Sequence, residues 1–196
     1  MNFKIRFEGA CIKITRDKNL FNSVVYLKQV HSEKIYFLDE NVEIEDIKSR
    51  EGDGIVTVCK GIYVGVRTAD CLAVAFINKE RVGVLHVGWR GLKKGIIENM
   101  GKFFPDKLNT FIFLSPSAGK CCYEVGEEFR DYFPSNIYLK SNKLIFDLRG
   151  EAMERLRRLG FVKFINYDVC TICNEKFPSY RRNRTEDRIY TLAKLL

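Results

Sequence analysis

The sequence predicts a domain of the α/β or α+β class, a sandwich in which helices cover a mixed sheet. Two observations carry this prediction. Short apolar runs typical of strands recur along the 196 residues, and three amphipathic helical patterns interrupt them. A chain of this length fits one domain, and no linker, repeat or low-complexity run divides it, so we expect a single domain over residues 1–196.

The predicted strands are short, and several are continuous apolar runs, as expected for strands buried on both faces. The chain opens with an alternation of apolar and charged residues over residues 2–14, which is a strand pattern. Further strands are expected at residues 24–28, 35–38, 55–58, 62–66, 72–77, 82–86, 110–114, 143–146 and 161–165.

Three segments have helical periodicity. The first covers residues 92–103, with Ile96, Ile97 and Met100 on one face. A shorter helix is expected at residues 126–132. The third covers residues 148–159, and Gly160 is expected to end it.

The composition indicates which kinds of binding partner and which cellular compartment to expect. The net charge of +8 is spread along the chain, which favours a small anionic substrate over nucleic acid. No stretch approaches the length of a membrane span, so no membrane partner is expected. The chain has an odd number of cysteines, 7, and opens without a secretory signal pattern, which favours a reducing cytoplasm with free thiols.

Two residues with catalytic potential stand at neighbouring strand ends. Cys71 directly precedes the expected strand 72–77, and His86 ends the expected strand 82–86, so a return of the chain can bring them together. Gly88 and Gly91 then leave room for a ligand or for close backbone approach. The chain contains 2 histidines, and the other, His31, also follows a strand-like run.

These residues allow more than one interpretation. A cysteine thiolate paired with an imidazole is a nucleophile with its base. The same pair with His31 as third ligand is a zinc site with one open position. Each residue alone could equally be a buried structural side chain.

Four further cysteines form two pairs in the sequence. Cys170 and Cys173 make a C-x-x-C motif, which binds metal only with a second pair. The adjacent Cys121 and Cys122 lack the usual spacing of such a pair. We therefore interpret all four as structural thiols.

The sequence resembles a known family at these positions and beyond them. The matching phrases run in order from Lys28 toward the C-terminus, and together they are specific. They are Lys28-Gln29-Val30-His31, Gly52-Asp53-Gly54, Thr68-Ala69-Asp70-Cys71, His86-Val87-Gly88-Trp89-Arg90-Gly91, Cys121-Cys122-Tyr123-Glu124-Val125-Gly126, Phe146-Asp147-Leu148, Cys170-Thr171 and Ser179-Tyr180-Arg181-Arg182. They resemble the YfiH family, whose members are also called laccase-domain proteins, multicopper polyphenol oxidases and peptidoglycan editing factors.

The resemblance implies a single-domain α/β/α sandwich with a mixed sheet and a zinc site on His31, Cys71 and His86. It implies phosphorolysis of adenosine, inosine and methylthioadenosine, and deamination of adenosine. The partners would then be a purine nucleoside and phosphate, with the chain a monomer or weak homodimer. Copper oxidation of phenols, which the laccase name implies, is disfavoured because the chain has 2 histidines.

Within this resemblance, roles can be assigned to further residues. Asp70 is expected to support the metal ligands or carry a proton. Arg67, Arg90 and Arg181 are expected to bind an anion, because a guanidinium fork fits phosphate. Tyr180 is expected to stack on a base. Positions that depart from the family pattern, such as Ala73 and Asn183, lie outside the three ligands, so they bear on substrate choice.

Two alternative functions stay open at this level. One is a metal-free cysteine hydrolase or amidase acting on peptidoglycan precursors, with Cys71 as nucleophile and His86 as base. The other is a non-catalytic module that binds a metal or a nucleotide.

Overall fold

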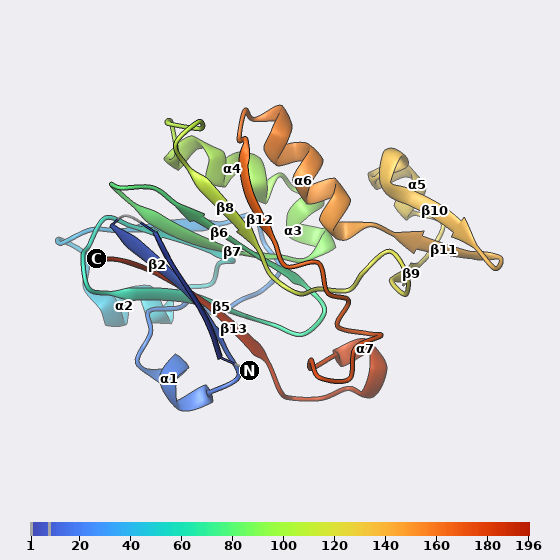
Figure 1. The fold of residues 1–196 in the computed structure, drawn as a ribbon, viewed down its shortest axis with the longest axis horizontal. Helices are drawn as coiled ribbons and strands as arrows, with labels where there is room; N and C mark the ends of the chain where they lie inside the picture. The colour runs from blue at the N-terminus through green and yellow to red at the C-terminus, as the bar shows by residue number, and fades with distance from the viewer. Residues whose placement is uncertain (1, 8) are drawn as a thin grey trace.

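The structure is a computed structural model that describes residues 2–7 and 9–196. Its centre is a 6-stranded mixed sheet with the order β12-β8-β6-β7-β4-β3 (Figure 1). Two outer pairs, β3 with β4 and β12 with β8, are parallel, and the inner pairs are antiparallel. The strands are β3 (Ile35–Leu38), β4 (Gly54–Thr57), β6 (Leu72–Ile77), β7 (Val82–Val87), β8 (Phe111–Leu114) and β12 (Lys163–Asn166).

A second, 4-stranded antiparallel sheet packs on one face of the central sheet (Figure 1). Its order is β1-β2-β13-β5. The strands are β1 (Asn2–Phe7), β2 (Ala10–Thr15), β5 (Tyr63–Thr68) and β13 (Ile189–Leu195). The short helix α1 (Lys18–Asn22) lies beyond it, and its Phe21 packs against Leu192 and Tyr190 of β13. The single α/β domain with a mixed sheet is confirmed. The expected α/β/α layering is not found, because a second sheet, and not a layer of helices, covers this face of the central sheet.

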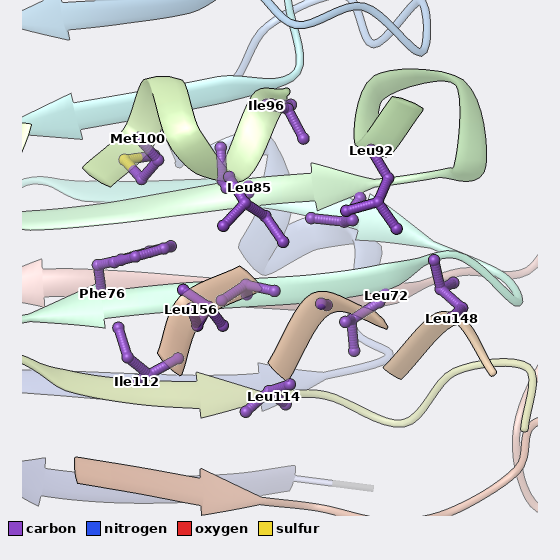
Figure 2. Close-up of a cluster of buried hydrophobic side chains, with 14 of the residues drawn as sticks. Leu72, Phe76, Leu85, Leu92, Ile96, Met100, Ile112, Leu114, Leu148 and Leu156 are labelled. Atoms are coloured by element: carbon purple, nitrogen blue, oxygen red, sulfur yellow. The ribbon is translucent and has the colours of Figure 1, made fainter. Parts of the chain in front are cut away.

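Helices cover the other face of the central sheet (Figure 1). They are α3 (Trp89–Lys93), α4 (Ile96–Phe103) and α6 (Leu148–Arg158). The side chains of β6 point alternately to the two faces of the central sheet, as in any strand. Leu72, Val74 and Phe76 pack toward the helices, while Ala73, Ala75 and Ile77 pack toward the second sheet. Figure 2 shows Leu156 of α6 among these apolar side chains.

The segment 92–103 forms two helices, so the prediction of one helix there is wrong. Gly95 separates α3 from α4 and has a φ of 86°, in the left-handed region that favours glycine. The predicted helix at residues 148–159 is confirmed as α6, and Gly160 follows it with a φ of 92°. In the segment 126–132, the helix α5 (Phe129–Tyr132) covers only the second half.

The predicted strand at residues 24–28 is also wrong. This segment makes isolated bridges, Val25 to Val64 and Lys28 to Glu51, and does not join a sheet as a strand. The other predicted strands are found, three with the predicted bounds and the rest with ends that differ by one or two residues. The alternating segment 2–14 forms the hairpin of β1 and β2.

Several elements have no counterpart in the sequence prediction. A 3-stranded sheet with the order β10-β11-β9 projects beside α5 (Figure 1). The elements without a counterpart are β9 (Glu124–Val125), β10 (Ile137–Lys140), the 3-10 helix η1 (Pro134–Asn136), α2 (Ile44–Ser49), α7 (Tyr180–Asn183), α1 and β13. The remaining strand of the 3-stranded sheet, β11 (Lys143–Phe146), is predicted. Among the described residues, no helix is long and apolar enough to cross a membrane.

The packing of α6 on the central sheet gives a stability prediction. Leu156 is fully buried, so Leu156→Ala leaves a cavity and should lower the free energy of unfolding by about 2–5 kcal/mol. Urea unfolding followed by circular dichroism measures this change. Leu108→Ala is the control, because Leu108 is 63% exposed and should cost less than about 0.5 kcal/mol. Equal effects of the two substitutions would contradict this packing.

Candidate metal centre

The candidate metal ligands lie at one end of the central sheet, where several strands begin or end together. Cys71 directly precedes β6, and the antiparallel pairing of β6 with β7 places Ala73 opposite His86. The next strand, β4, begins beside the same point, because Gly54 pairs with Leu85. The loop that carries His31 leads into β3, which pairs with β4. Four segments distant in sequence therefore converge on this end.

Three side chains form a compact set of metal donors. One ligand atom from each of His31, Cys71 and His86 lies within 4.8 Å of the others. The Cys71 Sγ is 3.8 Å from the His31 Nε2. The two imidazole rings meet edge to face, with centroids 4.7 Å apart. One thiolate and two imidazoles are a common zinc donor set, and three protein ligands leave a fourth position for a substrate or water.

A buried carboxylate, Asp53, orients both histidines. Its Oδ1 lies 2.7 Å from the His86 Nδ1 and also accepts a hydrogen bond from the His31 backbone N–H at 3.0 Å. Its Oδ2 accepts from both the backbone N–H and the hydroxyl of Ser32. Because Nδ1 of His86 is engaged, its Nε2 is the nitrogen left for a metal. Asp53 is fully buried, and His86 is 4% exposed.

The electrostatics of this group favour a charged sulfur. Burial would raise the pKa of Cys71, but the charge of His86 and hydrogen bonds from both histidines lower it to about 6. Burial would lower the pKa of His86, but Cys71 and Asp53 raise it to about 9. Asp53 is itself buried, which raises its pKa, yet the hydrogen bond and charge of His86 bring that pKa below its usual value. In the absence of a metal, both shifts favour a thiolate on Cys71 beside a protonated His86.

The loop that carries His31 packs closely against the backbone of Gly88 and Gly91. His31 has a φ of 59°, a conformation that nonglycine residues seldom adopt. A Cβ on Gly88 would come within 2.7 Å of the His31 ring, and one on Gly91 within 2.7 Å of the Ser32 carbonyl oxygen. Both glycines therefore make room for the His31 loop, as their place beside His86 in the sequence suggests.

The three donors open into a cavity of about 1110 Å³. His86 lies on the same face of β7 as Val82 and Val84, which pack toward the second sheet. The cavity therefore forms where the two sheets meet, and β5 and β13 contribute Arg67, Thr68 and Tyr190 to its wall. Its lining also includes basic and aromatic side chains: Arg16, Lys18, Arg90, Arg181, Arg188, Trp89, Tyr123 and Tyr180.

Comparison with known proteins identifies the family. The sequence model of the family described as "Multi-copper polyphenol oxidoreductase laccase" matches residues 12–195. A purine nucleoside phosphorylase of Aquifex aeolicus is 38% identical over 201 residues, covering 100% of this chain and 94% of that protein. The purine nucleoside phosphorylase YfiH of Escherichia coli is 33% identical over 189 residues, covering 91% of this chain and 76% of its own length. The chain belongs to the YfiH family.

Solved structures share the fold of this YfiH-family chain. The Neisseria meningitidis protein NMB0706 superimposes with a TM-score of 0.85 at 22% identity, covering 99% of this chain and 98% of its own. YlmD of Geobacillus stearothermophilus gives a TM-score of 0.84 at 22% identity, covering 96% of this chain and 93% of its own.

The predicted site residues of the YfiH-family chain all line this cavity: His31, Cys71, His86, Asp70, Arg67, Arg90, Tyr180 and Arg181. Arg67, Arg90 and Arg181 are exposed. The Arg90 guanidinium lies 4.6 Å from the centroid of the Trp89 ring. Arg181 donates to the Glu124 carbonyl oxygen at 3.0 Å. Tyr180 is 46% exposed at the cavity, so its ring is available for stacking.

Asp70 directs its carboxylate away from the metal donors and toward the C-terminal part of the chain. It accepts hydrogen bonds from the Thr171 hydroxyl and from the Arg181 backbone N–H, both at 2.7 Å. Asp70 has a φ of 83°, and its carbonyl oxygen accepts from Ala118. This residue fixes Arg181 at the cavity wall.

Sequence reasoning gave no role to Asp53 and did not place Tyr123 at the site. Asp53 lies in the Gly52-Asp53-Gly54 motif, and the two flanking glycines are the feature of the sequence that could have drawn attention to this aspartate. Tyr123 is buried, and burial together with the Cys71 charge raises its pKa. No feature of the sequence alone indicates that Tyr123 faces Cys71.

The expectation that Cys121 and Cys122 cannot complement the C-x-x-C motif is wrong. One sulfur from each of Cys121, Cys122, Cys170 and Cys173 lies within 4.8 Å of the others. The usual spacing is not required here, because a turn at Cys121 and Cys122 brings both sulfurs of the adjacent pair beside the C-x-x-C motif.

The dual contacts of Asp53 predict a loss of metal affinity in Asp53→Asn. An amide cannot supply the charge that Asp53 gives to His86, and we expect metal affinity to fall about 10- to 100-fold. Isothermal titration of the metal-free protein with Zn²⁺ measures this change. Glu151→Gln is the matched control, because Glu151 is a buried carboxylate that bonds to Asn136 and Arg155 and does not line the cavity. Comparable losses in both variants would argue against an orienting role specific to Asp53.

Proposed function

We propose that this protein is a zinc-dependent purine nucleoside phosphorylase that acts on adenosine, inosine and methylthioadenosine and also deaminates adenosine. The observation that carries this proposal is the three-donor metal set opening into a cavity lined by arginines and aromatic rings. The names of the Aquifex aeolicus and Escherichia coli relatives support the same reaction class.

The donor chemistry fits zinc. His31, Cys71 and His86 would hold the ion, with Asp53 keeping His86 in the orientation that presents Nε2. Bound there, zinc would polarise a substrate oxygen or lower the pKa of a water molecule. Oxidation by several copper ions needs more imidazole ligands than the 2 histidines of this chain supply.

The surrounding residues suit the two halves of a phosphorolysis. In that reaction a phosphate oxygen bonds to the anomeric carbon of the ribose, and the bond from that carbon to the purine nitrogen breaks. The guanidinium groups of Arg67, Arg90 and Arg181 can neutralise the phosphate. The exposed ring of Tyr180 can stack on the purine. Asp70 positions Arg181, and a role for it as a proton carrier stays a prediction.

Phosphate dependence tests the proposal directly. The zinc-loaded protein should convert adenosine to adenine and ribose 1-phosphate only when phosphate is present, and to inosine in either case. Chromatography of the products with and without phosphate measures both reactions. A zinc-loaded protein that yields neither adenine nor inosine would refute the proposal.

Loss of a donor should abolish both activities. Cys71→Ser and His31→Ala should each lower the rates at least about 100-fold, since changes to supporting residues alone cost 10- to 100-fold. Cys59→Ser is the control, because Cys59 lies in the core beside the Leu38 carbonyl oxygen. Rates and zinc content are measured on the same preparations, so a variant that keeps full activity without zinc would exclude a metal-dependent reaction.

The arginines should act mainly on phosphate. Arg90→Gln removes a charged hydrogen-bond donor and should raise the KM for phosphate about 10-fold or more, with a smaller change for the nucleoside. Steady-state kinetics at varied phosphate measures the effect. Arg130→Gln is the control, because Arg130 is an exposed residue of α5 that pairs with Glu127. An equal rise in both KM values would argue against phosphate binding at Arg90.

One observation favours a second candidate, a metal-free hydrolase or amidase acting on peptidoglycan precursors. Cys71 has its pKa lowered to about 6 beside His86, as a cysteine nucleophile requires. Chelation separates the two candidates. Zinc removal should stop phosphorolysis and zinc addition restore it, whereas a cysteine hydrolase should cleave muropeptides after chelation and lose that activity in Cys71→Ser.

A further inference from the structure

Four cysteines, Cys121, Cys122, Cys170 and Cys173, form a cluster that is separate from the His31, Cys71 and His86 set. It joins two loops, one between β8 and β9 that carries Cys121 and Cys122, and one before α7 that carries Cys170 and Cys173. The two loops are far apart in the sequence, so the close approach of their four sulfur atoms calls for a physical explanation.

The distances between these sulfurs bracket the spacing expected around a single tetrahedral ion. The Cys121 Sγ is 3.2 Å from the Cys173 Sγ and 3.6 Å from the Cys122 Sγ. Zinc–sulfur bonds of about 2.3 Å in a tetrahedron place sulfurs about 3.8 Å apart. All four sulfurs lie within 4.8 Å of one another. An iron–sulfur cluster needs wider spacing, because several iron and sulfide ions must fit between the cysteines.

The backbone holds the two loops together before any ion is considered. Ser117 and Cys170 form a parallel bridge, in which the Ser117 N–H donates to Val169 and the Thr171 N–H to Ser117. The C-x-x-C turn closes with a hydrogen bond from the Asn174 N–H to the Cys170 carbonyl oxygen. The site therefore has little conformational entropy left to lose on binding.

Buried and half-buried arginines brace the same loops. Arg149 is 5% exposed and donates to the Ser117 hydroxyl and to the Tyr167 carbonyl oxygen. Arg182 donates to the carbonyl oxygens of Thr171 and Phe177. These contacts fix the main chain on which the cysteines sit.

Without an ion, burial raises the pKa of Cys121 to about 11, and the hydrogen bond with Cys122 raises the pKa of Cys173 to about 11, so a bound ion would have to displace their protons. Two neighbouring groups would favour the thiolates of a metal-bound state. The Gly119 N–H donates to the Cys170 Sγ at 3.3 Å. A Cβ on Gly119 would lie 3.3 Å from this sulfur and 3.4 Å from the Cys121 Sγ, so glycine keeps the space beside both sulfurs open. The Lys140 ammonium, which donates to the Cys121 carbonyl oxygen, would offset part of the negative charge of four thiolates.

We propose that Cys121, Cys122, Cys170 and Cys173 bind a second zinc ion in a closed structural site. Four protein sulfurs fill the coordination sphere, so this ion would have no open position for a substrate. It would fasten the loop preceding Tyr123 to the loop of Thr171, which bonds to Asp70. The second zinc would thus hold the cavity wall in place without contacting the reacting groups.

Metal analysis of variants that each lack one of the two proposed zinc sites tests the proposal. Protein purified with zinc and a reductant should contain two zinc ions per chain by mass spectrometry of the metals. The double variant Cys121→Ser/Cys173→Ser should lose one, His31→Ala should lose the other, and Cys59→Ser should lose none. Unchanged zinc content in the double variant would overturn the second site, whatever the outcome for His31.

A spectroscopic arm covers the case in which the double variant fails to fold. In His31→Ala protein loaded with Co²⁺, four thiolates should give strong sulfur-to-cobalt charge-transfer bands and the d–d intensity of a tetrahedral ion. Absence of these bands would overturn the proposal. So would copper or iron in place of zinc at full occupancy, or a Cys121–Cys173 disulfide in protein kept under reductant.

Discussion

The carboxylate of Asp53 is the constraint on which the candidate metal centre depends. It accepts hydrogen bonds from the His31 and Ser32 backbone and also contacts the His86 ring, so one side chain joins a loop to a central strand. A buried carboxylate is costly unless its oxygens are satisfied, and here each oxygen has several partners. The same contacts that stabilise the buried charge therefore fix the His86 imidazole and the backbone of the His31 loop.

The two-sheet architecture explains why the centre is accessible. Alternate residues of β7 point to opposite faces, and the face of His86 is the one that packs against the second sheet. In the first half of the strand this face is buried by the packing of Val82 and Val84. At the end of the strand the sheets part, and the cavity with its arginines takes the place of apolar packing. Strand β7 thus contributes both core residues, Val82 and Val84, and a residue of the cavity, His86.

The sequence predicts most strands and the grouping of His31, Cys71 and His86, because these depend on local patterns and on ordered motifs. The continuous apolar run of β6 is visible without any tertiary information. The break at Gly95 was missed because Leu92, Ile96 and Met100 keep a helical period across it. The cysteine cluster was missed for a different reason. Cys121 and Cys173 meet only through the bridge of Ser117 with Cys170, and such long-range pairing leaves no local pattern.

The central place of β13 in the second sheet has a consequence for how the protein is made. This strand pairs with β2 on one side and β5 on the other, and both neighbours come from the first part of the chain. During synthesis these neighbours leave the ribosome with an open gap between them. The wall that carries Tyr190 and Arg67 can close only after residues 189–195 emerge, so a nascent chain acquires its cavity late.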